Sequence, residues 1–371
     1  MNIYLDNYNM GYKMAVVAKN EAVLKSLLEK NICCMYKSQN EIVFYPEGSK
    51  SHPNKAALNK VDKLENYDIV EISPNGILYR AYADKESDST VFMGSKCNSN
   101  CIMCPAGDAE RRKGGAYTKE QLETYISYLP DDVRFLILTG GEPTLNKDLF
   151  LFALQRIAYK FPAAQVLLLT NGRSLSNKEF CNQVVKVKPN KFRVAIPIHG
   201  ANSNLHDYIT RVPGSLEQTL SGIKRLLNKK IEVEVRIVVT QTNSLYLKEI
   251  VELIAKELPT VFCVNFVALE PRGNCAKNAN EVYIDHPTSF KRSKAAIDLL
   301  ISNGIDVGLY NYPLCSIDKG YWHLSSKSIA RYKAEYHPDC EQCDAKEMCG
   351  GLFTATLKFI KPQVYPISLG K

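Results

Sequence analysis

Cysteine is the residue type whose spacing in this sequence points most clearly to chemistry. Cys97, Cys101 and Cys104 lie in one short segment with the spacing C-x3-C-x2-C. Three neighbouring thiolates can bind three irons of a [4Fe-4S] cluster and leave the fourth iron without a protein ligand, as in a site kept open for a small molecule. The alternatives are a zinc knuckle, for which the loop offers no fourth Cys or His, and cysteines that are merely buried.

A second motif, Gly140-Gly141-Glu142-Pro143, follows the next apolar stretch of the chain. Its glycines allow a ligand to approach the backbone closely, and its carboxylate can accept hydrogen bonds from an ammonium group. Taken alone, such a motif is more often a plain strand-to-helix turn. Its place one predicted strand after the cysteine loop makes it a candidate binding site.

The C-terminal part contains a second group of cysteines, namely Cys315, Cys340, Cys343 and Cys349. Four thiolates are enough to close a metal site, and their spacing fits a second [4Fe-4S] cluster and zinc equally well. Because this region has few apolar residues, we expect bound metal to stabilise it. The remaining five cysteines of the chain are expected to be buried, unreactive thiols, with Cys275 as a candidate exception because it follows the sixth predicted strand on the active-site side.

The elements that must position these residues follow from the apolar pattern. From about residue 90, near-continuous apolar runs alternate with helix-like segments, as expected for parallel strands covered on both faces. Capping boxes that begin at Thr118, Ser176 and Ser215 indicate three of the helix starts. The predicted strands span 90–94, 133–139, 165–170, 192–198, 231–240 and 261–269, and the predicted helices span 118–129, 147–160, 177–187, 215–229, 244–258 and 287–303.

Six strand–helix units predict an α/β fold with a parallel sheet, either an open doubly wound sheet or a partial barrel. Ligands of such folds bind beyond the carboxyl ends of the strands, where both motifs are expected. We assign residues 90–305 to this domain. Residues 1–89 are expected to form a small α+β module with a hairpin turn at Ser73-Pro74-Asn75-Gly76, and residues 306–371 a cysteine-rich module.

Composition excludes several classes of protein. The chain of 371 residues is 45% apolar and 23% charged, which is typical of a globular protein. We expect a cytoplasmic protein without a membrane partner, because no apolar stretch could span a bilayer and the start does not resemble a signal peptide. Twelve cysteines in a reducing compartment then predict metal or redox chemistry. The net charge of +8 is scattered along the chain, so a nucleic-acid partner is not expected.

The two motifs, in this order and on successive predicted strands, resemble those of the radical S-adenosylmethionine (SAM) superfamily. The resemblance implies a partial (β/α)6 barrel in which Cys97, Cys101 and Cys104 bind a [4Fe-4S] cluster and SAM chelates the open iron. Cluster reduction would cleave SAM to methionine and a 5'-deoxyadenosyl radical, with an external electron donor such as flavodoxin or ferredoxin. It also implies a set of cofactor-binding residues: Gly140, Gly141, Glu142, Pro143, Asn171 and Arg236.

For Asn171 and Arg236 the alternative is a turn residue or a solvent-facing side chain. Closer similarity is to the HxsC family of radical maturases, which belongs to the His-Xaa-Ser peptide-modification system. It rests on residues 196–200 with His206 and Asp207, and on 309–315 and 340–351.

The HxsC resemblance implies a peptide side chain as substrate and an auxiliary [4Fe-4S] cluster at the second cysteine group, in a twitch/SPASM-like module. It places His206 and Asp207 toward the substrate, whereas the simpler interpretation is an exposed pair at a helix start. Two other functions remain open. One is a radical SAM enzyme that acts on a nucleotide or RNA, and the other is an iron-sulfur electron-transfer protein.

Overall fold

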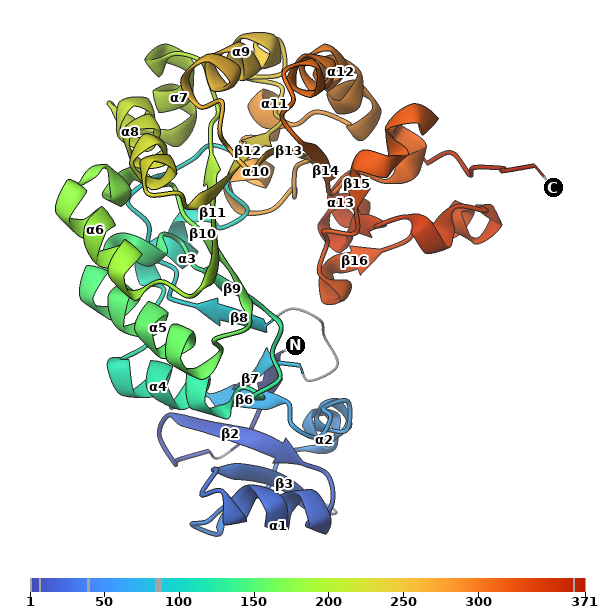
Figure 1. The fold of residues 1–371 in the computed structure, drawn as a ribbon. Coiled ribbons are helices and arrows are strands. Elements are labelled where there is room, and N and C mark those ends of the chain that lie inside the picture. Colours follow the sequence, from blue (N-terminus) through green and yellow to red (C-terminus); the bar gives the residue numbers. More distant parts are fainter. Residues whose placement is uncertain (1, 7, 39–40, 84–88, 363, 371) are drawn as a thin grey trace.

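The computed structural model describes residues 2–6, 8–38, 41–83, 89–362 and 364–370. Figure 1 shows three parts in chain order, from blue to red. An N-terminal sheet module is followed by a curved sheet with helices along its outer side, and the chain ends in a region of short turns. The curved sheet positions the first cysteine loop, and the last region contains the second group of cysteines.

The N-terminal module is a seven-stranded sheet in the order β1-β7-β6-β2-β3-β4-β5. The predicted hairpin joins β6 and β7, and Gly76 has a φ of 76°, with Leu5 O 2.6 Å from where a Cβ would lie. On β2, Met14 packs into the barrel core and Ala15 into the module's own core, so one face of the sheet covers the barrel. The elements are β1 (Asn2–Tyr4), β2 (Lys13–Ala18), α1 (Glu21–Glu29), β3 (Cys34–Ser38), β4 (Glu41–Tyr45), β5 (Ser49–Ser51), α2 (Lys55–Val61), β6 (Ile69–Ile72) and β7 (Ile77–Tyr82).

The central sheet is entirely parallel, in the order β15-β14-β13-β12-β11-β10-β9-β8. It contains all the predicted strands and curls into a half-barrel with helices outside, so the predicted α/β partial barrel is confirmed (Figure 1). Its strands are β8 (Ser89–Phe92), β9 (Phe135–Thr139), β10 (Gln165–Leu169), β11 (Lys191–Pro197), β12 (Glu232–Val238), β13 (Cys263–Val267), β14 (Val307–Tyr310) and β15 (Ser325–Ser326).

The helices between these strands include all those predicted and several short ones that periodicity missed. A single helical turn carries too few residues to establish an apolar period. The helices are α3 (Asp108–Lys113), α4 (Lys119–Tyr128), α5 (Lys147–Lys160), α6 (Lys178–Val187), α7 (Ser203–Thr210), α8 (Ser215–Asn228), α9 (Leu247–Glu257), α10 (Gly273–Lys277), α11 (Ala279–Val282) and α12 (His286–Ser302), with the 3-10 turns η1 (Pro143–Leu145) and η2 (Arg173–Ser176).

One of the three predicted capping boxes is present. Thr118 Oγ1 accepts from Gln121 N at 3.2 Å and the Gln121 side chain accepts from Thr118 N at 2.9 Å. The box at Ser176 is wrong, because Asn177 caps α6 by accepting from Phe180 N. The box at Ser215 is also wrong, because Ser215 is already the first helical residue after a left-handed glycine.

The barrel sheet continues past residue 305 into β14 and β15, and Leu309, Tyr312 and Ile317 belong to the barrel core. Beyond them the chain consists mainly of short turns around a small cluster of Ile329 and Phe353 with an alanine. No helix in the described ranges combines the length and apolar character needed to cross a membrane. The elements are η3 (Leu314–Ser316), η4 (Lys319–Leu324), η5 (Arg331–Lys333), β16 (Ala334–Glu335), η6 (Pro338–Gln342), η7 (Lys346–Met348), β17 (Leu352–Phe353) and α13 (Thr354–Phe359).

Candidate functional site

The cysteine loop follows β8 and contacts the Gly140-Gly141 motif after β9 through the backbone. Gly141 N donates to Gly94 O at 2.8 Å, and Glu142 N donates to Lys96 O at 2.9 Å. A Cβ on Gly141 would lie 2.3 Å from Ser95 O. The glycine is therefore required for the two predicted motifs to pack directly against each other.

The three thiols of the loop lie together. Burial raises the pKa of each of Cys97, Cys101 and Cys104, that of Cys101 to about 12. The negative charge of the Cys104 thiolate further raises the pKa of the other two, and that of Cys97 raises the pKa of Cys101. Mutual influence of this kind requires the sulfurs to be close in space. Without metal the three groups are protonated at neutral pH, so metal binding must displace protons.

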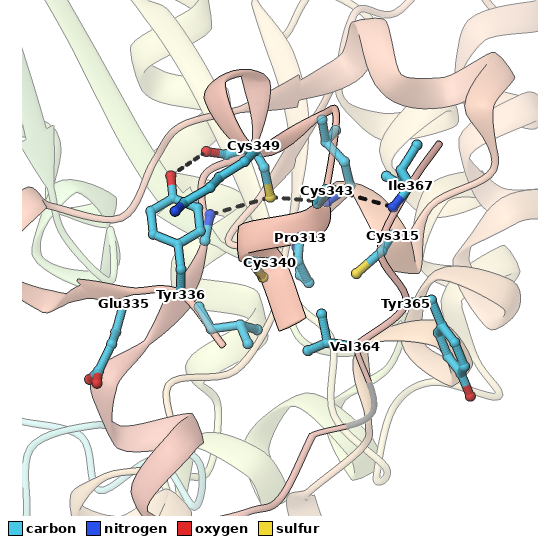
Figure 2. A pocket seen from close by; sticks show the side chains of 14 residues that line it. Pro313, Cys315, Glu335, Tyr336, Cys340, Cys343, Cys349, Val364, Tyr365 and Ile367 are labelled. Atoms are coloured by element: carbon cyan, nitrogen blue, oxygen red, sulfur yellow. Dashed lines mark hydrogen bonds between the residues drawn. The ribbon is translucent and has the colours of Figure 1, made fainter. Parts of the chain in front are cut away.

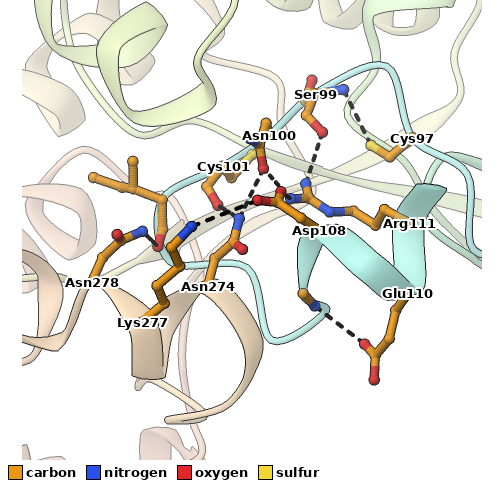
Figure 3. Close-up of polar contacts among 12 residues, drawn as sticks. Cys97, Ser99, Asn100, Cys101, Asp108, Glu110, Arg111, Asn274, Lys277 and Asn278 are labelled. Carbon is orange, nitrogen blue, oxygen red and sulfur yellow. Dashed lines mark hydrogen bonds and ion pairs between the residues drawn. The ribbon is translucent and has the colours of Figure 1, made fainter.

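Arg111, on α3, was not identified from the sequence and binds the same loop (Figure 3). Its Nη1 donates to Ser99 O at 2.8 Å, and its Nη2 donates to Asp108 Oδ1 at 2.9 Å and to Asn100 Oδ1. The side chain is only 8% exposed. In the sequence it stands in a run of basic residues that reads as solvated surface, so no local signal distinguishes it.

Helix α10, after β13, binds the other side of the loop (Figure 3). Asn274 Nδ2 donates to Cys101 O at 3.0 Å and Asn274 N donates to Cys104 O at 2.9 Å. Asn278 Nδ2 donates to Ile102 O at 2.8 Å. The position after the sixth predicted strand was the available signal, since loops at strand carboxyl ends meet around one site.

Glu142 is 4% exposed, and both its oxygens accept hydrogen bonds from the protein. Oε1 accepts from Thr144 N, Thr144 Oγ1 and Thr170 Oγ1 at 3.0, 2.6 and 2.7 Å, and Oε2 accepts from Asn171 N at 2.7 Å. The carboxylate thus connects the ends of β9 and β10. Only Oε2 retains a free acceptor position for an ammonium group.

Asn171 and Arg173 extend this connection to the cysteine loop. Asn171 Nδ2 donates to Asn98 Oδ1 at 2.7 Å. Arg173 Nη1 donates to Asn98 O at 2.9 Å and to Ser99 Oγ at 3.0 Å. Asn171 therefore lies beside the loop.

Arg236 lies on β12, on the face opposite to the core residues Val235 and Ile237, and so points into the barrel. Its Nε donates to the buried Glu234 at 2.6 Å, and its guanidinium lies 5.4 Å from the centre of the Tyr310 ring. The Arg236 side chain remains 24% exposed. An ion pair inside the barrel remains able to contact a ligand there.

His206 and Asp207 are not an exposed pair. His206 is 2% exposed, and its Nδ1 accepts from His199 N at 3.2 Å. Burial lowers the pKa of His206 to about 4, against the opposing charge of Asp207, so the imidazole is neutral. Asp207 accepts from Leu216 N and Ser215 Oγ, both at 2.9 Å, and therefore caps the first turn of α8.

The second group of cysteines lines one pocket with an empty volume of about 380 Å3 (Figure 2). Backbone amides of Leu314 and Gly351 donate to Cys349 Sγ, each at 3.4 Å, and Ile367 N donates to Cys343 Sγ at 3.4 Å. The structure therefore brings together the predicted set of Cys315, Cys340, Cys343 and Cys349.

Among the described residues, no three His, Cys, Asp or Glu side chains converge on a point where they could bind one metal ion. In an iron-sulfur cluster each cysteine binds a different iron atom, so its ligands need not converge in this way.

Comparison with known proteins agrees with this geometry. Residues 91–241 match the family model of the Radical SAM superfamily. The AdoMet-dependent heme synthase of Methanosarcina barkeri is 30% identical over 181 residues, which are 48% of this chain and 50% of that protein. The antilisterial bacteriocin subtilosin biosynthesis protein AlbA of Bacillus subtilis is 23% identical over 270 residues, 71% of this chain and 57% of that protein.

Among solved structures, Streptococcus suis SuiB bound to its precursor peptide SuiA superimposes with a TM-score of 0.50 at 14% identity. The match covers 61% of this chain and 48% of SuiB, and it shows similarity of fold. The chain spans about half the length of the curated relatives it matches. The family match, the parallel half-barrel and the cysteine loop after β8 show that residues 91–241 form a domain of the radical SAM superfamily.

Proposed function

We propose that this protein is a radical SAM enzyme whose [4Fe-4S] cluster is bound by Cys97, Cys101 and Cys104. The observation that carries the proposal is the packing of a loop with three neighbouring thiols against the Gly141-Glu142 backbone at the carboxyl ends of β8 and β9. An electron carrier needs neither an open three-cysteine loop nor a glycine motif beside it.

The loop fits such a cluster by the chemistry of its donors, because three soft thiolates are the ligands that iron-sulfur clusters take. When bound and reduced, the cluster supplies the electron that cleaves SAM into methionine and a radical able to abstract hydrogen from a substrate. Gly140, Gly141, Glu142 and Pro143 would contact the amino end of SAM. Glu142 Oε2 keeps acceptor capacity for this ammonium group after its bond to Asn171 N.

We assign an auxiliary [4Fe-4S] cluster to the pocket of Cys315, Cys340, Cys343 and Cys349. The backbone amides that point at Cys343 and Cys349 support this, since hydrogen bonds to sulfur favour the thiolate form. Zinc is the alternative for the same four sulfurs. Metal analysis of protein purified without oxygen distinguishes the two.

A ribosomally made peptide is the proposed substrate, as the HxsC resemblance and the AlbA relative suggest. A groove with an empty volume of about 2140 Å3, part of it open to solvent, lies between β7 and β8. Among the described strands β8 is the edge of the barrel sheet, and an extended peptide can add to such an edge. Tyrosines form much of the groove's lining: Tyr12, Tyr79, Tyr82, Tyr117, Tyr125 and Tyr332.

The test of the chemistry is anaerobic reconstitution with iron and sulfide, followed by reduction with dithionite or with flavodoxin and its reductase. We expect 5'-deoxyadenosine from the parent and none from C97A/C101A/C104A. Continued reductive cleavage by the triple variant would refute the assignment. Mass spectrometry of a small peptide encoded beside the gene, after co-expression with this chain, tests the substrate class.

The similarity to AdoMet-dependent heme synthase favours a second candidate substrate, a tetrapyrrole. Incubation of the reconstituted enzyme with an iron porphyrin and SAM separates the candidates. Porphyrin oxidation or decarboxylation without any change in the peptide would replace the peptide proposal and leave the radical chemistry in place.

A further inference from the structure

We propose that Arg111 is a positioning residue that raises the reduction potential of the cluster at the first cysteine loop. This inference rests on the proposed cluster at Cys97, Cys101 and Cys104. It assigns a function to a buried cation that the family match and the cysteine motif leave unexplained.

The guanidinium of Arg111 lies directly against the cysteine loop. Arg111 is 8% exposed, and its two Nη atoms donate hydrogen bonds to Ser99 O and Asn100 Oδ1 of the loop (Figure 3). Because Ser99 and Asn100 lie between Cys97 and Cys101, these bonds hold the positive charge beside the cysteine loop.

Arg111 also has a buried hydrogen-bond donor, Nε, that is not used. Among the described residues, no acceptor lies within hydrogen-bond distance of Arg111 Nε, although this atom is buried. Buried N–H groups are rarely left unpaired, and an unpaired one in a native site calls for a partner such as a bound ion. A thiolate or sulfide of the cluster is an acceptor of the required kind.

The charge of Arg111 affects the oxidised and reduced states of the cluster differently. Reduction by one electron makes the cluster and its thiolates more negative, and a fixed cation in a poorly hydrated site stabilises that state. Asp108, bound to Arg111 Nη2 at 2.9 Å, offsets part of this charge and is 32% exposed. Arg111 thus favours the reduced cluster, and Asp108 moderates the effect.

Arg173, on η2, provides a matched control because it binds the same loop. It also donates two hydrogen bonds to the loop, to Asn98 O and Ser99 Oγ. Unlike Arg111, it is only half-buried and its Nε is paired, with Gln218 Oε1 at 2.9 Å, so water screens its charge more strongly. A purely structural role would therefore give similar results for both arginines, and an electrostatic role would not.

The experiment is an anaerobic redox titration of the reconstituted full chain, followed by electron paramagnetic resonance. The first-site signal is the part absent from C97A/C101A/C104A. At the potential where half of the parent's first site is reduced, R111Q should show a reduced-to-oxidised ratio about tenfold lower, equal to about 59 mV for one electron. R111K, which keeps the charge, and R173Q, which keeps Arg111, should remain within about twofold of the parent.

D108N provides an independent measurement, because it keeps all three cysteines and both arginines. It should raise the reduced-to-oxidised ratio of the first site. Unchanged ratios in both R111Q and D108N would overturn the proposal, as would an equal fall in R173Q. If R111Q binds no iron, D108N alone decides, because only an electrostatic role predicts a rise. Absence of any first-site signal in the parent would instead contradict the proposed cluster itself.

Discussion

The two cysteine regions of this protein are built in different ways. The loop of Cys97, Cys101 and Cys104 lies at the end of a long parallel sheet, and buried side chains such as Arg111 and Asn274 bind its carbonyl groups. The pocket around Cys343 and the other C-terminal cysteines lies among short turns, with a core cluster of only three buried residues and sulfurs bound by backbone amides.

The shape of the first loop is fixed by the protein, whereas we expect the shape of the C-terminal cysteine region to depend on what it binds. The first loop has partners on α3, α7, α10 and η2; for example, Ile102 N donates to Ile209 O at 3.0 Å. The second region has too little apolar area to order itself, so its cohesion should come from metal. Loss of metal should therefore leave the first region folded and loosen the second.

The largest expected effect is that of C343S. We expect loss of the second metal and at least a hundredfold faster amide exchange from about residue 319 onward, because metal binding and folding are coupled in such modules. Leu309, Tyr312 and Ile317 should stay protected, since they belong to the barrel core. Hydrogen exchange measured by mass spectrometry provides the test, with C97A/C101A/C104A as the matched variant. Equal loosening of both regions by their respective variants would remove the contrast.

The next effect concerns Glu142, which connects the two strand ends beside the first loop. E142A should lower the free energy of unfolding by about 2 kcal/mol or more, because buried Thr144 and Thr170 donors lose their acceptor. T170V removes the bond to Glu142 at 2.7 Å and the one that Thr170 Oγ1 accepts from Gly172 N at 3.1 Å, and should cost about 1 to 2 kcal/mol. Urea unfolding followed by circular dichroism measures both. Full stability of E142A, combined with weakened SAM binding, would show that the carboxylate serves the cofactor alone.

A smaller effect is expected for Asn278, the residue that directly follows α10. N278A removes the donor to Ile102 O at 2.8 Å and should cost about 1 kcal/mol, since one loop carbonyl loses its partner. Iron content at the first site should remain that of the parent, because the loop keeps its bonds from Arg111 and Asn274. Loss of iron in N278A would contradict the view that protein contacts alone fix the shape of the first loop.

The smallest effect is a dependence on pH at Asp207, next to the segment of α7 that binds the loop backbone. Burial alone would raise the pKa of this carboxyl, but hydrogen bonds from Leu216 N, Ser215 Oγ and Gly214 N lower it below the ordinary value of 3.8. Its stabilising contribution is therefore complete above that value and lost as pH falls through the lower folded pKa.

D207N should cost about 1 kcal/mol near neutral pH, as loss of a helix cap does. The difference from the parent should shrink in acid, and urea titrations at several pH values measure it. A difference that stays constant down to the acid limit would show that ionisation of Asp207 is irrelevant to the cap.

Local patterns in the sequence were enough to predict much of this protein. The C-x3-C-x2-C loop, the Gly140-Gly141 motif and the strand–helix alternation are all read from residues close together in the chain, because apolar period and turn chemistry are local properties. The hairpin at Gly76 and the cap at Thr118 follow for the same reason.

Only the tertiary structure decided which side chains bind the loop. The Asn274–Cys101 bond joins residues 173 positions apart, and the local sequence does not specify which side chains the parallel crossovers bring into contact. The same reason explains why Ser215 was mistaken for a cap that Asp207 provides, and why His206 was taken for an exposed residue although it is buried. The sequence specifies the chemical type of each side chain, whereas its burial and its hydrogen-bond partners arise only when distant segments pack.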